Sequence, residues 1–150
     1  MSEGSIPMRL LIVDDHEIVR IGIRLLLSAR DNWEICGEAK DGFEAVEKVA
    51  ELSPDIVILD LTMPVLSGLD VARQIREISP SVKIVFFSIH EMPTAARLVG
   101  ADAFVSKSLA AEQLEKAIDA VLQKSPQWAD STAAHTNGTS KFQWDTSKPR

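Results

Sequence analysis

The sequence has little cysteine and no long apolar run. Its 150 residues contain a single cysteine, Cys36, which excludes an internal disulfide framework and gives no sign of an oxidising compartment. No apolar stretch approaches the roughly 20 residues that a membrane-spanning helix needs. Residues 1–7 lack the basic and apolar segments of a secretory signal. We therefore expect a cytoplasmic protein with no membrane segment.

Positive charge is also scarce relative to negative charge. The chain has 16 Lys and Arg residues against 22 Asp and Glu residues, a formal net charge of −6 at pH 7. Nucleic acid binding depends on many contacts from Lys and Arg to phosphates, so we expect no direct nucleic acid binding by this chain. The hydrophobic share of 45% is ordinary for a globular domain with a full core.

Strand-like and helix-like segments alternate five times along the chain. Apolar runs bounded by turn residues predict strands over 9–13, 34–39, 56–60, 83–88 and 103–106. Helical periodicity and capping residues predict helices over 17–29, 41–52, 67–78, 94–99 and 110–124. Five such pairs imply an α/β fold, in which a parallel sheet is covered by helices on both faces.

Two of the predicted helices carry an apolar stripe that indicates a buried face. The stripe of the first helix comprises Ile18, Ile21, Gly22, Leu25 and Leu26. The stripe of the last helix comprises Leu114, Ala117, Ile118, Val121 and Leu122. Beyond residue 124 the chain is polar and shows no period. We predict an N-terminal extension over 1–7, one domain over 8–124, and a polar tail or truncated linker over 125–150.

Three carboxylates stand where two apolar runs end. Asp14 and Asp15 follow the run 10–13, and Asp60 follows the run 56–59. If these runs are neighbouring parallel strands, the acids meet at one edge of the sheet. Two like charges about 4 Å apart repel by roughly 4 kcal/mol at an effective dielectric near 20, so the cluster needs a cation or a bound proton. A hard divalent cation such as Mg²⁺, with phosphate chemistry at its open positions, fits best.

Each acid also has a purely structural interpretation. Asp14 and Asp15 could cap the next helix, and Asp60 could be a turn residue. Their coincidence at adjacent strand ends favours the cation site, to which the backbone carbonyl of Thr62 could add an oxygen. As an ionised carboxylate, Asp60 is also a competent nucleophile toward phosphorus.

Two further polar residues emerge at the same predicted edge. Ser88 ends the fourth strand and Lys107 follows the fifth. Alone, such a serine is usually a cap and such a lysine is usually solvated. Together they supply the hydroxyl and the ammonium that a transferring phosphoryl group needs besides a metal. His16 and His90 lie nearby in sequence, but neither has metal-ligand spacing with another His or Cys, so we do not expect them to be ligands.

In combination these pieces resemble the response-regulator receiver domain, the CheY-like family. The matching segments, within residues 8–124, are 11–16, 58–64 with Gly68, Ser88, Gly100 with Ala101, and Lys107. The stretches 14–22, 37–42 and 87–91 are most similar to the LuxR/NarL-type subfamily. The resemblance implies a flavodoxin-like, doubly wound five-stranded parallel sheet of order 2-1-3-4-5.

The resemblance also implies a role for each site residue. Asp60 would accept a phosphoryl group from a phosphohistidine of a sensor histidine kinase, while Asp14 and Asp15 hold Mg²⁺. Ser88 and Lys107 would bind phosphoryl oxygens. Phe104 matches the position of a rotating aromatic residue, which fills the space vacated when the phosphoryl group draws Ser88 inward. Such a two-state switch would control an output partner or domain, as in transcription regulation.

Three features depart from the family pattern. Ser88 and Lys107 are closer in sequence than is usual, which predicts a short or irregular fourth helix. Ser108 stands where many members have proline. The segment 125–150 is too short for the helix-turn-helix output domain that the subfamily usually carries, so we expect either an excised receiver or a stand-alone regulator.

Three functions therefore stay open. The first is a phospho-accepting receiver, with a homodimer through the first and fifth helices. The second is a degenerate receiver that acts only in docking or dimerisation, which the curtailed fourth segment favours. The third is a Mg²⁺-dependent aspartyl phosphatase. Two observations argue against it: Asp14 and Asp15 do not form the alternating Asp-x-Asp pattern, and the chain has no substrate-selecting cap.

Overall fold

Strands and helices alternate throughout the described part of the chain, which comprises residues 6–89, 93–108 and 111–123 of a computed structural model. The strands are β1 (Met8–Val13), β2 (Trp33–Ala39), β3 (Ile56–Leu59), β4 (Lys83–Ser88) and β5 (Ala103–Ser106). The helices are α1 (Glu17–Leu27), α2 (Gly42–Leu52), α3 (Gly68–Ile78), α4 (Pro93–Leu98) and α5 (Ala111–Leu122). The whole predicted tail, residues 125–150, lies outside the described residues, as do residues 1–5. None of the described helices is long and apolar enough to span a membrane.

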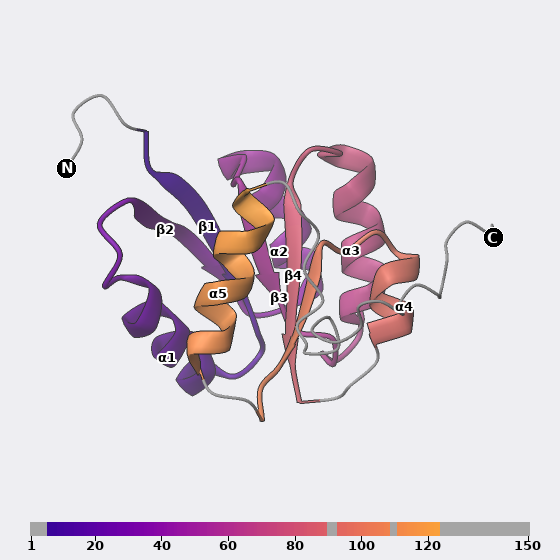
Figure 1. The fold of residues 1–150 in the computed structure, drawn as a ribbon. Coiled ribbons are helices and arrows are strands. Elements are labelled where there is room, and N and C mark those ends of the chain that lie inside the picture. Colours follow the sequence, from indigo (N-terminus) through magenta and orange to yellow (C-terminus); the bar gives the residue numbers. More distant parts are fainter. Residues whose placement is uncertain (1–5, 90–92, 109–110, 124–150) are drawn as a thin grey trace, which may run out of the picture.

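The five strands form one parallel sheet in the order β2-β1-β3-β4-β5. Helices α1 and α5 cover one face, and α2, α3 and α4 cover the other (Figure 1). This is the fold class that the sequence predicted. Because β1 and β3 are neighbours, with Val13 paired with Leu59, the residues that follow them emerge side by side.

Each face of the sheet carries its own hydrophobic core, because successive strand residues point to opposite faces. Leu11, Val13 and Leu59 belong to the core under α2 and α3. Leu10 and Ile12 belong to the core under α1 and α5. Burial on both sides explains why the inner strands are continuous apolar runs rather than alternating ones.

The buried face of α1 is not the predicted one. The residues fully buried on this helix are Ile23 and Leu27, whereas Ile18 and Leu25 are 74% and 69% exposed. Of the predicted stripe, Leu26 alone packs against the core as a partly buried residue. The helix is apolar on two sides, so periodicity alone could not choose between them. The α5 stripe, in contrast, is buried as predicted.

The helix boundaries follow local capping chemistry. The Asp41 carboxylate accepts a hydrogen bond of 2.8 Å from the Glu44 N–H, and the Ser67 hydroxyl accepts one of 3.3 Å from the Asp70 N–H. Helix α4 has only six residues, which confirms the prediction of a short fourth helix. Helix α1 ends at Leu27, two residues before the predicted end.

One arginine joins the end of α3 to two other segments. The Arg76 guanidinium donates hydrogen bonds to the carbonyls of Pro80 at 2.8 Å, Val82 at 2.6 Å and Gly100 at 2.8 Å. It also pairs with Asp102 at 3.3 Å. These contacts fix the start of β4 and the turn between α4 and β5, both of which support the strand ends where Ser88 and Lys107 stand.

Arg76→Met should therefore lower the free energy of unfolding by about 2 kcal/mol, the usual range for losing charge-assisted hydrogen bonds. Arg73→Met is the matched control, because the ion pair of Arg73 with Asp70 is largely exposed and should contribute less than about 1 kcal/mol. Urea denaturation of both variants measures the difference. Equal losses in the two variants would contradict this role of Arg76.

Candidate functional site

The acids that follow β1 and β3 lie together at the carboxyl edge of the sheet. The Asp60 N–H donates a hydrogen bond of 3.1 Å to the Val13 carbonyl, and the Asp14 N–H donates one of 3.1 Å to the Ala39 carbonyl. The backbone hydrogen bonds of the sheet thus extend to the residues that follow β1 and β3, and they fix the backbone positions of Asp14 and Asp60. Ligand atoms of Asp14, Asp15, His16 and Asp60 all lie within 4.8 Å of one another. The predicted gathering of the three carboxylates is present.

Lys107 brings a positive charge into this cluster. Its Nζ lies 2.6 Å from Asp14 Oδ2 and 3.6 Å from Asp60 Oδ2. Both carboxylates are buried, with Asp14 1% and Asp60 4% exposed. The backbone N–H of Lys107 donates a hydrogen bond of 2.9 Å to the Ser88 carbonyl. The ends of β4 and β5 therefore place the hydroxyl and the ammonium beside the acids.

The environment of Asp60 favours its protonated form. Burial is the main cause that raises its pKa above the ordinary value of 3.8, and the negative charge of Asp14 raises the pKa further. Lys107, the Thr62 N–H and the Ser88 hydroxyl oppose this shift. Lys107 alone does not neutralise the cluster, which leaves room for a second positive charge.

The donor set fits a hard divalent cation. Carboxylate oxygens are the ligands that Mg²⁺ prefers, and Asp14, Asp15 and Asp60 supply them. Asp15 Oδ1 is buried and receives no hydrogen bond from the described residues, although His16 Nδ1 lies 3.2 Å from it. The Thr62 N–H donates to Asp60 Oδ1 at 3.3 Å, so this residue lines the same site. The assignment of its carbonyl as a ligand stays a prediction.

The two predicted switch residues are both turned inward. Ser88 is fully buried and its hydroxyl hydrogen-bonds to Asp60. Phe104 is 6% exposed and belongs to the hydrophobic core that also contains Ala96 and Ala101. Their assignment as switch residues stays a prediction.

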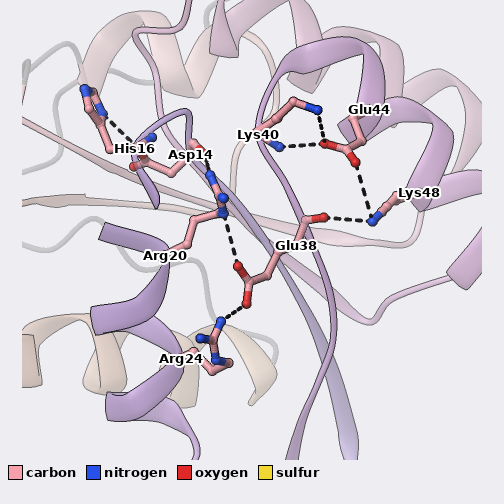
Figure 2. A network of polar contacts seen from close by, with 8 residues as sticks. All are labelled: Asp14, His16, Arg20, Arg24, Glu38, Lys40, Glu44 and Lys48. Atoms are coloured by element: carbon pink, nitrogen blue, oxygen red, sulfur yellow. Dashed lines mark hydrogen bonds and ion pairs between the residues drawn. The ribbon is translucent and has the colours of Figure 1, made fainter. Parts of the chain in front are cut away.

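Two residues near the acids were not predicted as part of the site. The Arg20 guanidinium donates a hydrogen bond of 2.6 Å to the Asp14 carbonyl and another of 3.1 Å to the Glu38 carboxylate. His16 lies one helical turn before Arg20 and points to the Asp14 side chain (Figure 2). The signal in the sequence is their closeness to Asp14, since His16 is the extended N-cap residue of α1 and Arg20 lies in the first turns of that helix.

The loop after β3 contains a strained residue. Val65 has φ of 69°, and the Leu66 N–H donates a hydrogen bond of 2.7 Å across it to the Pro64 carbonyl. A β-branched residue in this left-handed region is a true outlier. Val65 is 88% exposed, so its side chain gains little packing in return.

Val65→Gly should raise the free energy of unfolding by about 1 kcal/mol, because glycine adopts positive φ without a steric penalty. Thermal unfolding measures the gain. Val65→Ala keeps the Cβ and serves as the control, for which we expect a smaller gain. If Val65→Gly unfolds at a lower temperature than the wild-type chain, Val65 is not strained.

Asp60→Asn should stabilise the chain in the absence of divalent cations by roughly 1 to 3 kcal/mol at neutral pH, because the variant buries no charge at this position. The raised pKa of Asp60 means that the folded wild-type chain holds this proton more tightly than the unfolded chain. Wild-type stability therefore falls as the pH rises from 3.8 through the raised pKa. The difference in free energy of unfolding between Asp60→Asn and the wild-type chain should therefore shrink as the pH is lowered toward 3.8. Urea denaturation in EDTA across this range checks the trend; a constant difference would contradict it.

Comparisons with known proteins bear on the family to which the chain belongs. The sequence profile of the response regulator receiver domain matches residues 10–119. The chain is 36% identical over 115 residues to the response regulator protein VraR of Staphylococcus saprophyticus, covering 75% of this chain and 55% of VraR. It is 37% identical over 115 residues to the nitrate/nitrite response regulator protein NarL of Escherichia coli K12, covering 75% of this chain and 53% of NarL.

A similar solved structure is that of a two-component response regulator of the LuxR family from Aurantimonas sp. SI85-9A1. It superimposes with a TM-score of 0.80 at 34% identity and covers 85% of this chain and 94% of that chain. The chain spans about half the length of the curated relatives that it matches. On the profile match, the sequence identities and the shared fold, the chain belongs to the family of response regulator receiver domains.

Proposed function

We propose that Asp60 of this chain accepts a phosphoryl group from a phosphohistidine of a sensor histidine kinase. A carboxylate oxygen of Asp60 attacks phosphorus, an acyl phosphate bond forms, and the P–N bond breaks with its electron pair leaving on the imidazole. The observation that carries the proposal is the meeting of three carboxylates and the Lys107 ammonium at one edge of the sheet. The protein would act in the cytoplasm and would have no separate substrate that it turns over.

The proposal gives each neighbouring residue a task. Asp14, Asp15, Asp60 and the carbonyl of Thr62 would hold Mg²⁺, which when bound would neutralise charge on the phosphoryl oxygens. Lys107 would pair with one phosphoryl oxygen, since its ammonium already lies within reach of Asp60. Preorganised charges of this kind supply most of the catalysis in phosphoryl transfer.

Ser88 and Phe104 would form the switch. The Ser88 hydroxyl would donate to a phosphoryl oxygen, and Phe104 would then hold its buried position between the sheet and α4. The short α4 leaves little surface to respond to this movement. This favours signalling through another face of the domain and also supports the alternative of a receiver that only docks.

Intact-mass spectrometry after incubation with acetyl phosphate and Mg²⁺ tests the proposal. We expect one added phosphoryl group on the wild-type chain and none on Asp60→Asn. If the wild-type chain stays unmodified while a control receiver domain is labelled, the phospho-acceptor proposal fails and the docking function takes its place. Multiple turnover of a generic phosphoester would instead favour the aspartyl phosphatase.

A homodimer through α1 and α5 is the proposed signalling assembly. The outward face of α1 exposes Ile18 and Leu25, and these two residues lie two turns apart on one stripe. Such apolar exposure on a helix favours a protein partner. Gel filtration with and without the phosphodonor should show a phosphorylation-dependent dimer that Leu25→Glu abolishes. A phosphorylated chain that stays monomeric would contradict this assembly.

A further inference from the structure

Arg20 of α1 joins the main chain at Asp14 to the end of β2. Its guanidinium donates a hydrogen bond of 2.6 Å to the Asp14 carbonyl and, through Nε, one of 3.1 Å to the Glu38 carboxylate. Figure 2 shows the guanidinium between these two acceptors. The Arg20 side chain is 14% exposed, so both hydrogen bonds are largely shielded from water, which strengthens them.

The carbonyl that Arg20 binds belongs to the peptide unit between Asp14 and Asp15. Because a peptide unit is planar, holding its carbonyl also fixes the direction in which the Cα atoms of both acids lie. The Asp14 N–H is already bound to the Ala39 carbonyl at 3.1 Å. Arg20 therefore adds a second restraint, beyond the end of β1, on the backbone that carries two of the proposed Mg²⁺ ligands.

Glu38 keeps Arg20 in this orientation. Its carboxylate also pairs with Arg24, one turn further along α1, and its carbonyl accepts a hydrogen bond of 3.0 Å from the Lys48 ammonium of α2 (Figure 2). Two helices thus hold the residue to which Arg20 is bound. A guanidinium is planar and presents its donors in a rigid fork, so anchoring Nε determines where the donor toward Asp14 points.

The charge of Arg20 and its geometry have opposite effects on cation binding. A guanidinium beside the acids repels a divalent cation, so removing its charge alone would tighten Mg²⁺ binding. Removing the restraint would weaken Mg²⁺ binding, because ligands that are not held in place must be ordered when the cation binds. The ion pair with Glu38 at 3.1 Å offsets much of the charge, so the effect of the restraint should be the larger one.

We propose that Arg20 is a positioning residue for Mg²⁺ binding, which orients the peptide unit between Asp14 and Asp15 so that both carboxylates face the cation. The inference rests on the proposed function of the acid cluster, but it assigns a task to a residue outside that cluster. In this role Arg20 acts only through the main chain of Asp14, and Glu38 acts only through Arg20.

Isothermal titration calorimetry of Mg²⁺, without any phosphodonor, on the wild-type chain and three variants tests the proposal. Arg20→Met should weaken Mg²⁺ binding by about tenfold, the lower end of what losing a partner of a metal ligand costs. Arg20→Lys is the milder change and should also weaken binding, because an ammonium keeps the charge but lacks the rigid fork. Arg24→Met is the matched control, since Arg24 pairs with the same carboxylate but, among the described residues, donates no hydrogen bond to Asp14.

The Mg²⁺ affinity of Arg24→Met should change by less than about twofold, because the Arg24 side chain is 40% exposed and its charge is well screened. Unchanged or tighter Mg²⁺ binding in the Arg20 variants, or equal losses in Arg20→Met and Arg24→Met, would overturn the proposal. Labelling of the wild-type chain by acetyl phosphate and Mg²⁺, followed by intact mass, separates the two hypotheses. A labelled wild-type chain with wild-type Mg²⁺ affinity in the Arg20 variants contradicts only this inference, whereas an unlabelled wild-type chain contradicts the proposed function.

Discussion

Lys107→Met should lower the free energy of unfolding by about 3 kcal/mol in the absence of divalent cations, the size of loss seen when one partner of a buried ion pair is removed. The Lys107 ammonium lies 2.6 Å from Asp14 and 3.6 Å from Asp60. Both carboxylates are almost fully buried, so methionine would leave their repulsion without compensation. Urea denaturation in EDTA measures the loss.

Mg²⁺ should restore part of this stability, because the cation takes over the neutralisation of the same carboxylates. Lys40→Met is the matched control, since the Lys40 side chain is 69% exposed and its ion pair with Glu44 is 3.9 Å long. We expect the control to lose less than about 0.5 kcal/mol. A Lys107→Met variant as stable as the control, with or without Mg²⁺, would show that the lysine does not hold the cluster together.

Gly68→Ala should be nearly as damaging. An added Cβ would lie 2.2 Å from the Asp60 carbonyl oxygen and 2.7 Å from the Leu61 Cα. Both are backbone atoms, so the loop after β3 would have to shift, at a cost of about 3 kcal/mol. Since the displaced atoms belong to Asp60, the proposed phospho-acceptor, and to its neighbour, labelling by acetyl phosphate should slow by about tenfold or more.

Gly22→Ala is the control for this glycine substitution, because no heavy atom lies within 4 Å of a Cβ at Gly22. In the interior of α1, alanine should stabilise the chain by about 0.5 to 1 kcal/mol. Denaturation curves and labelling rates of both variants give the comparison. A Gly68→Ala variant with normal stability and a normal labelling rate would mean that the close approach of α3 to Asp60 is not required.

The strand ends were predictable because their signal is local. Doubly buried strands are continuous apolar runs, and the first polar residue after each run marks its carboxyl end. Asp14, Asp60 and Ser88 were found in this way, and Lys107 was found as the residue that follows the fifth predicted strand. Resemblance to a family supplied the strand order, which no local pattern contains.

Other features could not be predicted because they depend on tertiary packing. Helix α1 is apolar on two sides. The orientation in which it packs against the sheet determines that Ile23 is buried and Leu25 is exposed. Gly68 was visible as part of a motif, but the reason for it, the proximity of the Asp60 carbonyl, is a contact between segments. The contact of the His16 ring with the Asp14 carboxylate was also not predicted, because the orientation of an exposed ring has no signal in the sequence.

The central claim is that one carboxylate in this cluster, that of Asp60, forms the acyl phosphate, while the others hold the cation. Borohydride reduction of the labelled protein, followed by peptide mass spectrometry, measures this directly, because it converts a phosphorylated aspartate into homoserine. We predict homoserine at residue 60 alone, and only when Mg²⁺ was present during labelling. Homoserine at residue 14 or 15, or labelling that proceeds fully in EDTA, would contradict the claim.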